Sequence, residues 1–268
     1  MDNNGYYGQI EKRRHKNLKE MVDQGIIPVG VGISLPCPAI AEYAALAGYD
    51  FVSLDLEHGL YNLETVCDII RTADSCGLAT TARVADKDLI LPLLDFGLVG
   101  VAVPHVRSAA QARELVERTK YKPAGRRGFN SSGRAHSYGR KPFADCAAEA
   151  ADEITLAVQI EDLEGLENVD EILAVPGIDY LQLGPGDLSA DLGHPGNDKH
   201  PVVLAALKKI LKTADKYGVK YFGTGAPISI VEDKSFLIRA FTEARVGIHD
   251  RAKAMFEADR KLMEAVQL

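Results

Sequence analysis

The stretch FVSLDLEHGLYNLETVCDIIRTADSCGLATTARV, residues 51–84, holds a complete strand–helix–strand unit. A short apolar, β-branched run at Asp50–Leu56 opens it, and a second run at Ala79–Val84 closes it. Between the two runs, Leu63–Cys76 repeats apolar residues at the spacing of one helix face. The unit therefore predicts two neighbouring parallel strands joined by a right-handed helical crossover.

The same alternation continues along most of the chain. Further strands are expected at Pro28–Ile33, Val99–Val103, Thr155–Ile160, Asp179–Leu183 and Lys220–Thr224. Further helices are expected at Ala39–Ala47, Ala109–Thr119 and Val202–Tyr217. For the eighth strand, the candidates are Phe236–Thr242 and Ala244–Ile248; we prefer the first because Ile248 begins a helix face.

This pattern predicts an α/β fold, a single closed (β/α)8 TIM barrel over residues 17–268, preceded by a polar extension at residues 1–16. A doubly wound open sheet is the competing architecture. No G-x-G-x-x-G turn follows the first strand, so the barrel is favoured.

The amino-acid composition of the chain limits the classes of molecule that it could bind. The chain has 268 residues with a formal charge of −7, which argues against nucleic acid or an anionic membrane as the main partner. None of the four cysteines forms a C-x-x-C pair, which is typical of reduced cytosolic thiols. The N-terminus has no signal-peptide core, and the apolar stretch Ile26–Ile40 is broken by prolines and glycines. We expect a soluble cytoplasmic protein.

The segment from Lys120 to Asp152 interrupts the alternation of predicted strands and helices. It is rich in Gly, Ser and Arg, and it is locally basic in an acidic protein. We expect an extended loop that belongs to the functional site, although a solvated surface loop remains the alternative. Within it, Arg134 and His136 are candidates either for substrate contact or for a structural role.

Polar residues at the ends of predicted strands are the candidates for chemistry, because barrel active sites lie at that end. His58 follows the second strand among carboxylates, where a histidine can act as a base, although such a residue is often structural. Arg83 closes the third strand and needs an anion, either a structural carboxylate or a substrate.

Two carboxylates suggest a metal site. Gln159 and Glu161 are two residues apart on the fifth strand and so point to the same face. Asp187 follows Gly186 just after the sixth strand, where a helical turn begins. Glu161 and Asp187 suit an oxygen-preferring cation such as Mg²⁺ or Mn²⁺, although helix caps or salt bridges would explain the spacing equally well.

Taken together, these residues resemble the HpcH/HpaI family of metal-dependent pyruvate aldolases over about residues 17–260. The resemblance is carried by the following motifs: Asp55-Leu-Glu57-His58, Leu94-Asp95-Phe-Gly97, Val103-Pro104, residues 120–128, Val158-Gln159-Ile-Glu161 and Gly184-Pro-Gly186-Asp187-Leu-Ser189. The resemblance implies a barrel of the phosphoenolpyruvate/pyruvate type that cleaves or forms 4-hydroxy-2-oxo acids through a pyruvate enolate.

The resemblance also implies a role for each site residue. Glu161 and Asp187 would ligate Mg²⁺ or Mn²⁺, with Co²⁺ also possible, while Gln159 and the N–H groups of Gly186 and Asp187 would hold the carboxylate end of the substrate. Arg83 would stabilise the enolate oxygen, and His58 would be the general base. Asp95 would raise the basicity of His58 across a subunit boundary, in a homo-oligomer that is commonly a hexamer.

The sequence departs from the family pattern at Leu56, Val84 and Phe129-Asn130, which leaves the identity of the aldehyde open. A Schiff-base lysine is not favoured, because Lys220 opens its strand rather than closing it. The remaining alternatives are an oxaloacetate-type decarboxylase, a lyase for CoA thioesters, and a barrel that binds a 2-oxo acid without catalysis.

Overall fold

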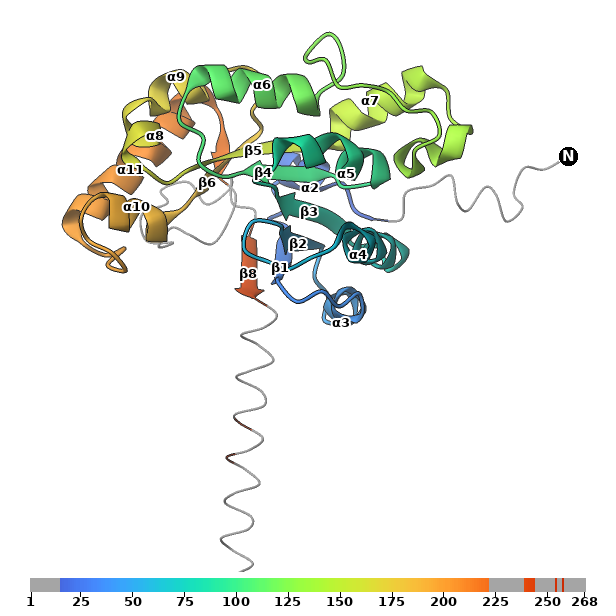
Figure 1. Cartoon of the computed structure of the whole chain (residues 1–268), viewed down its shortest axis with the longest axis horizontal. Coiled ribbons are helices and arrows are strands. Elements are labelled where there is room, and N and C mark those ends of the chain that lie inside the picture. Colours follow the sequence, from blue (N-terminus) through green and yellow to red (C-terminus); the bar gives the residue numbers. More distant parts are fainter. Residues whose placement is uncertain (1–14, 222–238, 244–253, 255–256, 258–268) are drawn as a thin grey trace, which may run out of the picture.

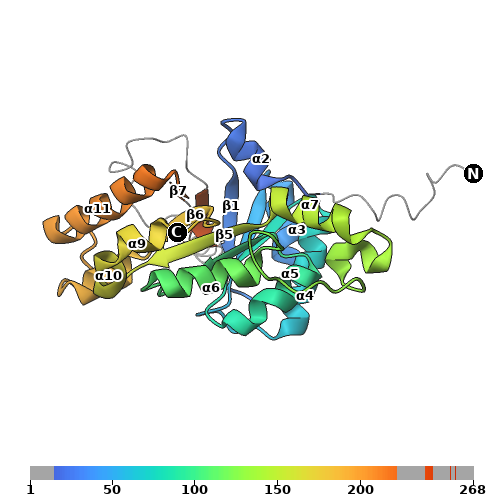
Figure 2. The same cartoon turned by 90° about the horizontal axis from the view of Figure 1, so that it is seen from above.

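The computed structural model describes residues 15–221, 239–243, 254 and 257. Within this part of the chain, strands and helices alternate as predicted. Every strand pairing is parallel, in the order β7-β6-β5-β4-β3-β2-β1-β8. Figures 1 and 2 show that this sheet is strongly curved, with helices along its outer side. No helix among the described residues is long and apolar enough to cross a membrane.

The seven strands predicted before residue 225 are confirmed, most of them to within one residue at each end. They are β1 (Val29–Ile33), β2 (Phe51–Asp55), β3 (Ala79–Arg83), β4 (Gly100–Val103), β5 (Thr155–Ile160), β6 (Tyr180–Leu183) and β7 (Lys220–Tyr221). The last part of the predicted seventh strand, residues 222–224, lies outside the described residues.

The eighth strand, β8, spans Arg239–Glu243 and pairs with β1, with Val29 opposite Arg239. This agrees with the preferred prediction of Phe236–Thr242, of which residues 236–238 lie outside the described part. The rejected candidate begins where β8 ends. Among the described residues, β7 and β8 are the two edges of the sheet.

The four predicted helices are confirmed as α3 (Ala39–Leu46), α4 (Leu63–Ser75), α6 (Ala109–Thr119) and α11 (Pro201–Tyr217). Side chains fix two of their starts: Asn62 accepts from the backbone N–H of Thr65 in α4, and Ser108 accepts from that of Gln111 in α6. Gly218 ends α11 in the left-handed conformation that a residue without a Cβ adopts at low cost.

Six further helices and two 3-10 turns lie among residues 15–221. They are α2 (Leu18–Asp23), η1 (Lys87–Leu89), α5 (Ile90–Phe96), η2 (Arg134–Gly139), α7 (Phe143–Glu153), α8 (Leu163–Glu167), α9 (Val169–Leu173) and α10 (Pro185–Asp191). The prediction of an extended loop over Lys120–Asp152 is therefore wrong for its second half. The buried face of α7 is made of small or charged residues, Cys146, Ala150 and Glu153, and so gives no strong apolar period.

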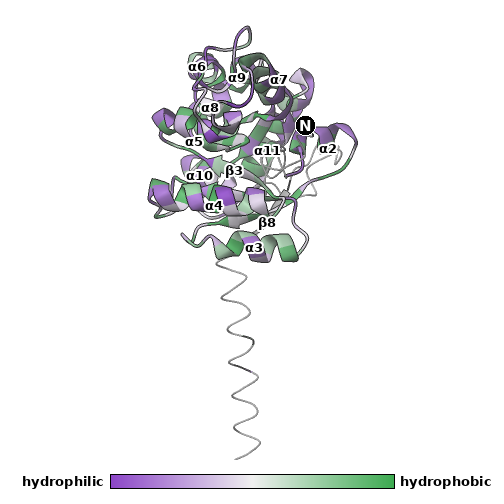
Figure 3. Cartoon of the chain, turned by 90° about the vertical axis from the view of Figure 1, so that its right-hand side faces the viewer, coloured by the Kyte–Doolittle hydropathy of each residue, from purple (hydrophilic) through white to green (hydrophobic). Residues whose placement is uncertain are grey.

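Two apolar clusters lie on the two faces of the sheet. The larger cluster fills the space between the sheet and the outer helices, and Figure 3 shows hydrophobic and hydrophilic residues alternating along α3 and α4. The smaller cluster includes Phe51, Ala79 and Tyr180, and these strand residues alternate with those of the larger one. They therefore point to the concave face, where Leu18 and Val22 of α2 pack against them.

The last two residues of the predicted N-terminal extension contact the rest of the described chain. The His15 ring lies between the carboxylates of Asp74 and Glu153, and Lys16 Nζ lies 2.6 Å from Asp50 Oδ1. Residues 1–14 lie outside the described part.

Candidate active site

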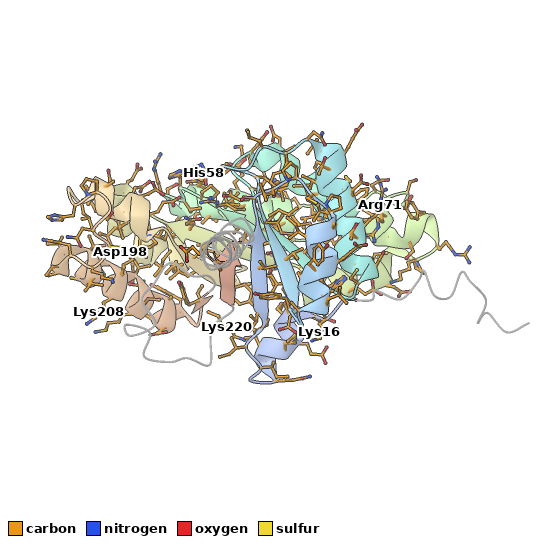
Figure 4. The ribbon with its side chains drawn as sticks, turned by 90° about the horizontal axis from the view of Figure 1, so that it is seen from below. Lys16, His58, Arg71, Asp198, Lys208 and Lys220 are labelled. Carbon is orange, nitrogen blue, oxygen red and sulfur yellow. The ribbon has the colours of Figure 1, made fainter. Side chains whose placement is uncertain are left out.

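The predicted polar residues gather at the carboxyl ends of the parallel strands. Asp55 ends β2 and Arg83 ends β3, and these two residues are register partners. Glu161 follows β5, and α10 begins directly after β6. Figure 4 shows His58 at one end of the strands and Lys220 at the other, so Lys220 lies away from the candidate site. This placement agrees with the argument against a Schiff-base lysine.

Gln159 and Glu161 share one face, as their two-residue spacing predicts. Gln159 Nε2 donates to Glu161 Oε2 at 2.5 Å, and both side chains are buried. The Gln159 Oε1 atom is buried without a hydrogen-bond partner. A buried acceptor left in this way is costly unless a bound group donates to it or coordinates it.

Glu161 is held in an electrostatically unusual environment. Burial raises the pKa of its carboxyl group, and the negative charges of Asp187 and Glu57 raise it further. A hydrogen bond from the His105 backbone N–H and the nearby His105 ring act in the opposite direction. Neighbouring carboxylates with one raised pKa are stabilised when a cation binds between them.

Arg83 makes the intrachain salt bridge that one of the two sequence interpretations expected. Its Nε and Nη2 atoms lie 2.9 and 2.6 Å from the two oxygens of Asp55, and its Nη1 lies 3.1 Å from Glu57 Oε2. Although burial alone would raise the pKa of Asp55, the hydrogen bonds and charge of Arg83 hold it below its usual value. The guanidinium is therefore oriented and stays charged, with part of its surface open.

His58 lies in the turn after β2, and its side chain is 68% exposed. Asp55 Oδ1 accepts from the backbone N–H of His58 at 3.3 Å, which fixes the turn. The His58 Nε2 atom lies 3.7 Å from Glu57 Oε2. An imidazole at this position is free to meet a ligand above the strand ends.

Asp95 lies on α5 and is bound within its own chain. Its Oδ1 atom accepts from Arg127 Nη2 at 2.8 Å, and the Arg127 side chain is 1% exposed and stacked over the Tyr121 ring. The two other candidates from the basic segment also have intrachain partners. Arg134 Nη2 binds Asp74 at 2.5 Å, and His136 hydrogen-bonds to Tyr121 and to the Asn130 carbonyl.

Sequence reasoning gave no role to two residues of the site: His105, which lies just after β4, and Glu57, which lies beside His58 in the turn after β2 and entered only as part of a motif. The His105 Nδ1 atom is 3.2 Å from Glu161 Oε1, and its Nε2 atom is 3.3 Å from Glu57 Oε1. The available signal was a polar residue two positions beyond the apolar strand Gly100–Val103, the same signal that identified His58.

A family model described as HpcH/HpaI aldolase/citrate lyase matches residues 31–252. The chain belongs to this family. A 2-dehydro-3,6-dideoxy-6-sulfogluconate aldolase from Pseudomonas putida is 35% identical over 225 residues, which is 83% of this chain and 85% of the relative. A 5-keto-4-deoxy-D-glucarate aldolase from Klebsiella pneumoniae is 36% identical over 204 residues, or 75% and 78%.

A solved structure gives the same result for this HpcH/HpaI family member. The HpcH/HpaI aldolase from Desulfitobacterium hafniense superposes with a TM-score of 0.80 at 30% identity, covering 90% of this chain and 96% of that one. The predicted enzyme class, an aldolase-type carbon–carbon lyase, is confirmed by the family and by the relatives. These relatives do not favour the alternatives of a decarboxylase, a CoA-thioester lyase or a non-catalytic barrel.

Proposed function

We propose that the chain is a divalent-metal-dependent aldolase that cleaves or forms 4-hydroxy-2-oxo acids through a pyruvate enolate. The observation that carries the proposal is the buried Glu161 carboxylate, whose pKa is raised beside Asp187 at the strand ends. The donor set fits a hard cation, because both ligands are carboxylates and the side chain of Gln159, which contacts Glu161, has a buried Oε1 atom without a partner.

Glu161 and Asp187 would hold Mg²⁺ or Mn²⁺, with Co²⁺ as a further candidate. Among the described residues, no group of three His, Cys, Asp or Glu side chains is arranged to hold a metal, so these two carboxylates would leave positions for substrate oxygens. A cation bound there supplies positive charge for the 2-oxo oxygen on which negative charge develops.

The residues of the chain would divide the remaining work. Gln159 and the backbone N–H groups of Gly186 and Asp187 would orient the substrate carboxylate. In the cleavage direction, His58 would take the proton of the 4-hydroxyl group. The C3–C4 bond then breaks, the aldehyde leaves, and the electron pair forms the enolate, whose oxygen Arg83 would stabilise. Asp95 from a neighbouring protomer would raise the basicity of His58.

We further propose that the aldehyde carries a polar or anionic end. Two relatives are named for sugar-acid and sulfo-sugar-acid substrates, which supports this class. We also propose that the sheet closes into a (β/α)8 barrel of the phosphoenolpyruvate/pyruvate type. Eight parallel strands in sequential order, with β8 beside β1, support closure.

The test is pyruvate release from a panel of 4-hydroxy-2-oxo acids, including 5-keto-4-deoxyglucarate, with EDTA and after addition of Mg²⁺ or Mn²⁺. We expect release that EDTA abolishes, that metal restores, and that Glu161→Gln removes. The control variant is Glu164→Gln, because Glu164 lies three residues further on and its side chain is 64% exposed. Release that survives both EDTA and Glu161→Gln would overturn the metal-dependent mechanism.

A further inference from the structure

His105 occupies a backbone conformation that is uncommon for a residue with a side chain. It follows Pro104 at the end of β4 and has a φ of 54°. This turn aims the backbone N–H of His105 at Glu161 Oε1, at a distance of 2.8 Å. The conformation of the chain just after β4 thus allows a hydrogen bond to the Glu161 carboxylate, which follows the neighbouring strand β5.

The His105 ring joins two carboxylates of the candidate site. Its Nδ1 atom lies 3.2 Å from Glu161 Oε1, and its Nε2 atom lies 3.3 Å from Glu57 Oε1. The other oxygen of Glu57 lies 3.1 Å from Arg83 Nη1. A continuous set of polar contacts therefore runs from the proposed metal ligand, through His105 and Glu57, to the arginine proposed to stabilise the enolate.

We propose that His105 is a positioning residue that orients the Glu161 carboxylate for metal binding and fixes it relative to Glu57. This inference rests on the proposed function. The two Glu161 oxygens accept from Gln159 Nε2 and from the His105 backbone N–H, and the ring adds a separate contact, from its Nδ1 atom to Oε1 at 3.2 Å. Partners that hydrogen-bond to a ligating carboxylate set its orientation, and their loss weakens metal binding about 10- to 100-fold.

His105 is suited to this role rather than to a role in the core. Its side chain is 44% exposed, so the fold does not need the ring for packing. Asp162, the third carboxylate near the ring, lies 3.9 Å away and is already bound by Arg107 at 2.6 Å. The ring therefore serves mainly Glu161 and Glu57.

The test variant is His105→Gly, which keeps the backbone N–H and tolerates positive φ but removes the ring. Tyr138→Gly is the matched control, because Tyr138 has a φ of 53° and is 62% exposed. His105→Gln is the conservative variant, since its amide can still donate to one carboxylate. Glu161→Gln tests the metal site itself.

Calorimetric titration of the metal-free proteins with Mn²⁺ measures binding without any assay of turnover. We expect wild type and Tyr138→Gly to bind alike, His105→Gly to bind about 10- to 100-fold more weakly, and His105→Gln to lie between. Because His105 acts through the metal site, saturating Mn²⁺ should restore most of the kcat of His105→Gly in pyruvate release.

The outcomes distinguish a failure of the proposed role of His105 from a failure of the proposed metal-dependent function. If wild type and Glu161→Gln bind Mn²⁺ equally, or neither binds it, the proposed metal site fails and this inference fails with it. If Glu161→Gln loses binding while His105→Gly binds as wild type does, only the role of His105 is overturned. Tighter binding by His105→Gly would also overturn it, because the ring would then be a cation competing with the metal.

Discussion

Gly184 shows how closely the candidate site is packed. A Cβ added at this position would lie 2.2 Å from Glu161 Oε2 and 2.8 Å from Gln159 Nε2. Its φ of −110° is open to any residue, so the requirement for glycine comes from the close approach and not from the backbone. The backbone at the end of β6 therefore packs closely against the Glu161 carboxylate.

We expect Gly184→Ala to displace the Glu161 carboxylate and so to weaken Mn²⁺ binding about 10- to 100-fold, with a parallel loss of pyruvate release at limiting metal. Gly128→Ala is the control, because a Cβ there meets only an ordinary contact with Leu91 at 3.8 Å. Calorimetry measures the binding, and circular dichroism shows whether both variants fold. Unchanged Mn²⁺ binding by Gly184→Ala would mean that Glu161 does not rest against β6 when metal is bound.

At the scale of single residues, the two-residue period of a strand predicted the Gln159–Glu161 pair but did not predict the position of His105. Gln159 and Glu161 share a face because alternate strand residues do, and this follows from sequence. His105 reaches Glu161 only because the backbone turns to positive φ after β4, and no residue pattern in this chain announces that turn. Its contact with Glu57 depends on how the ends of β2 and β4 lie relative to each other in space, which the sequence does not give.

Among the elements, the N-terminal segment before α2 is held by a partly buried cluster of ionisable side chains. His15 contacts Asp74 at the end of α4 and Glu153 at the end of α7, while Arg134 of η2 binds the second Asp74 oxygen. Burial alone would raise the pKa of Asp74, but the hydrogen bond from His15 and the charge of Arg134 lower it to about 2. This cluster thus links four elements at one end of the sheet.

We expect Asp74→Asn to lower the free energy of unfolding at pH 7 by about 1–2 kcal/mol, a range that allows for the partial exposure of Asp74. The folded pKa of about 2 lies below the ordinary value of 3.8, so the contribution is present above about pH 4 and is lost as the pH falls toward 2. Urea denaturation at several pH values measures the difference. Asp68→Asn, on the exposed face of α4, is the control, and a difference that persists unchanged at low pH would contradict the ionic origin.

The elements that sequence predicted are those with strong periods and clear ends. The helix α4 has four buried apolar residues on one face and an asparagine cap, and its predicted start is correct. The helices α8 and α9 are five residues each, too short for a period to be seen. In α2, Leu18 and Val22 become a buried pair only because the concave face of the sheet lies beneath them.

For the whole molecule, parallel strands in sequential order place the candidate groups that follow β2, β3, β5 and β6 at one edge of the sheet, so residues as distant in sequence as His58 and Asp187 are proposed to meet one substrate. The sequence predicted this arrangement because each strand–helix unit has the same direction. It did not predict which outer surfaces stay uncovered, because the sequence alone does not distinguish an apolar helix residue that packs on the sheet from one that another protomer would cover.

One such surface lies on α3, where Tyr43 is 71% and Leu46 is 84% exposed. Tyr43 and Leu46 are one helical turn apart and so share a face. Large apolar side chains gathered in this way mark protein–protein contacts more often than isolated ones do. Their exposure supports the proposed homo-oligomer, in which a neighbouring protomer would also bring Asp95 to His58.

We therefore expect light scattering to give wild type the mass of a hexamer, six times the 29.0 kDa chain, and to give Tyr43→Glu/Leu46→Glu a smaller assembly. Val202→Glu is the control, since Val202 is an apolar residue that is 47% exposed but lies on α11. If Asp95 acts across the boundary, the dissociated variant should lose pyruvate release while still binding Mn²⁺, because both proposed metal ligands belong to one chain. A dissociated variant with full activity would place the whole reaction within one protomer, and a monomeric wild type would leave the Asp95–Arg127 pair with a structural role alone.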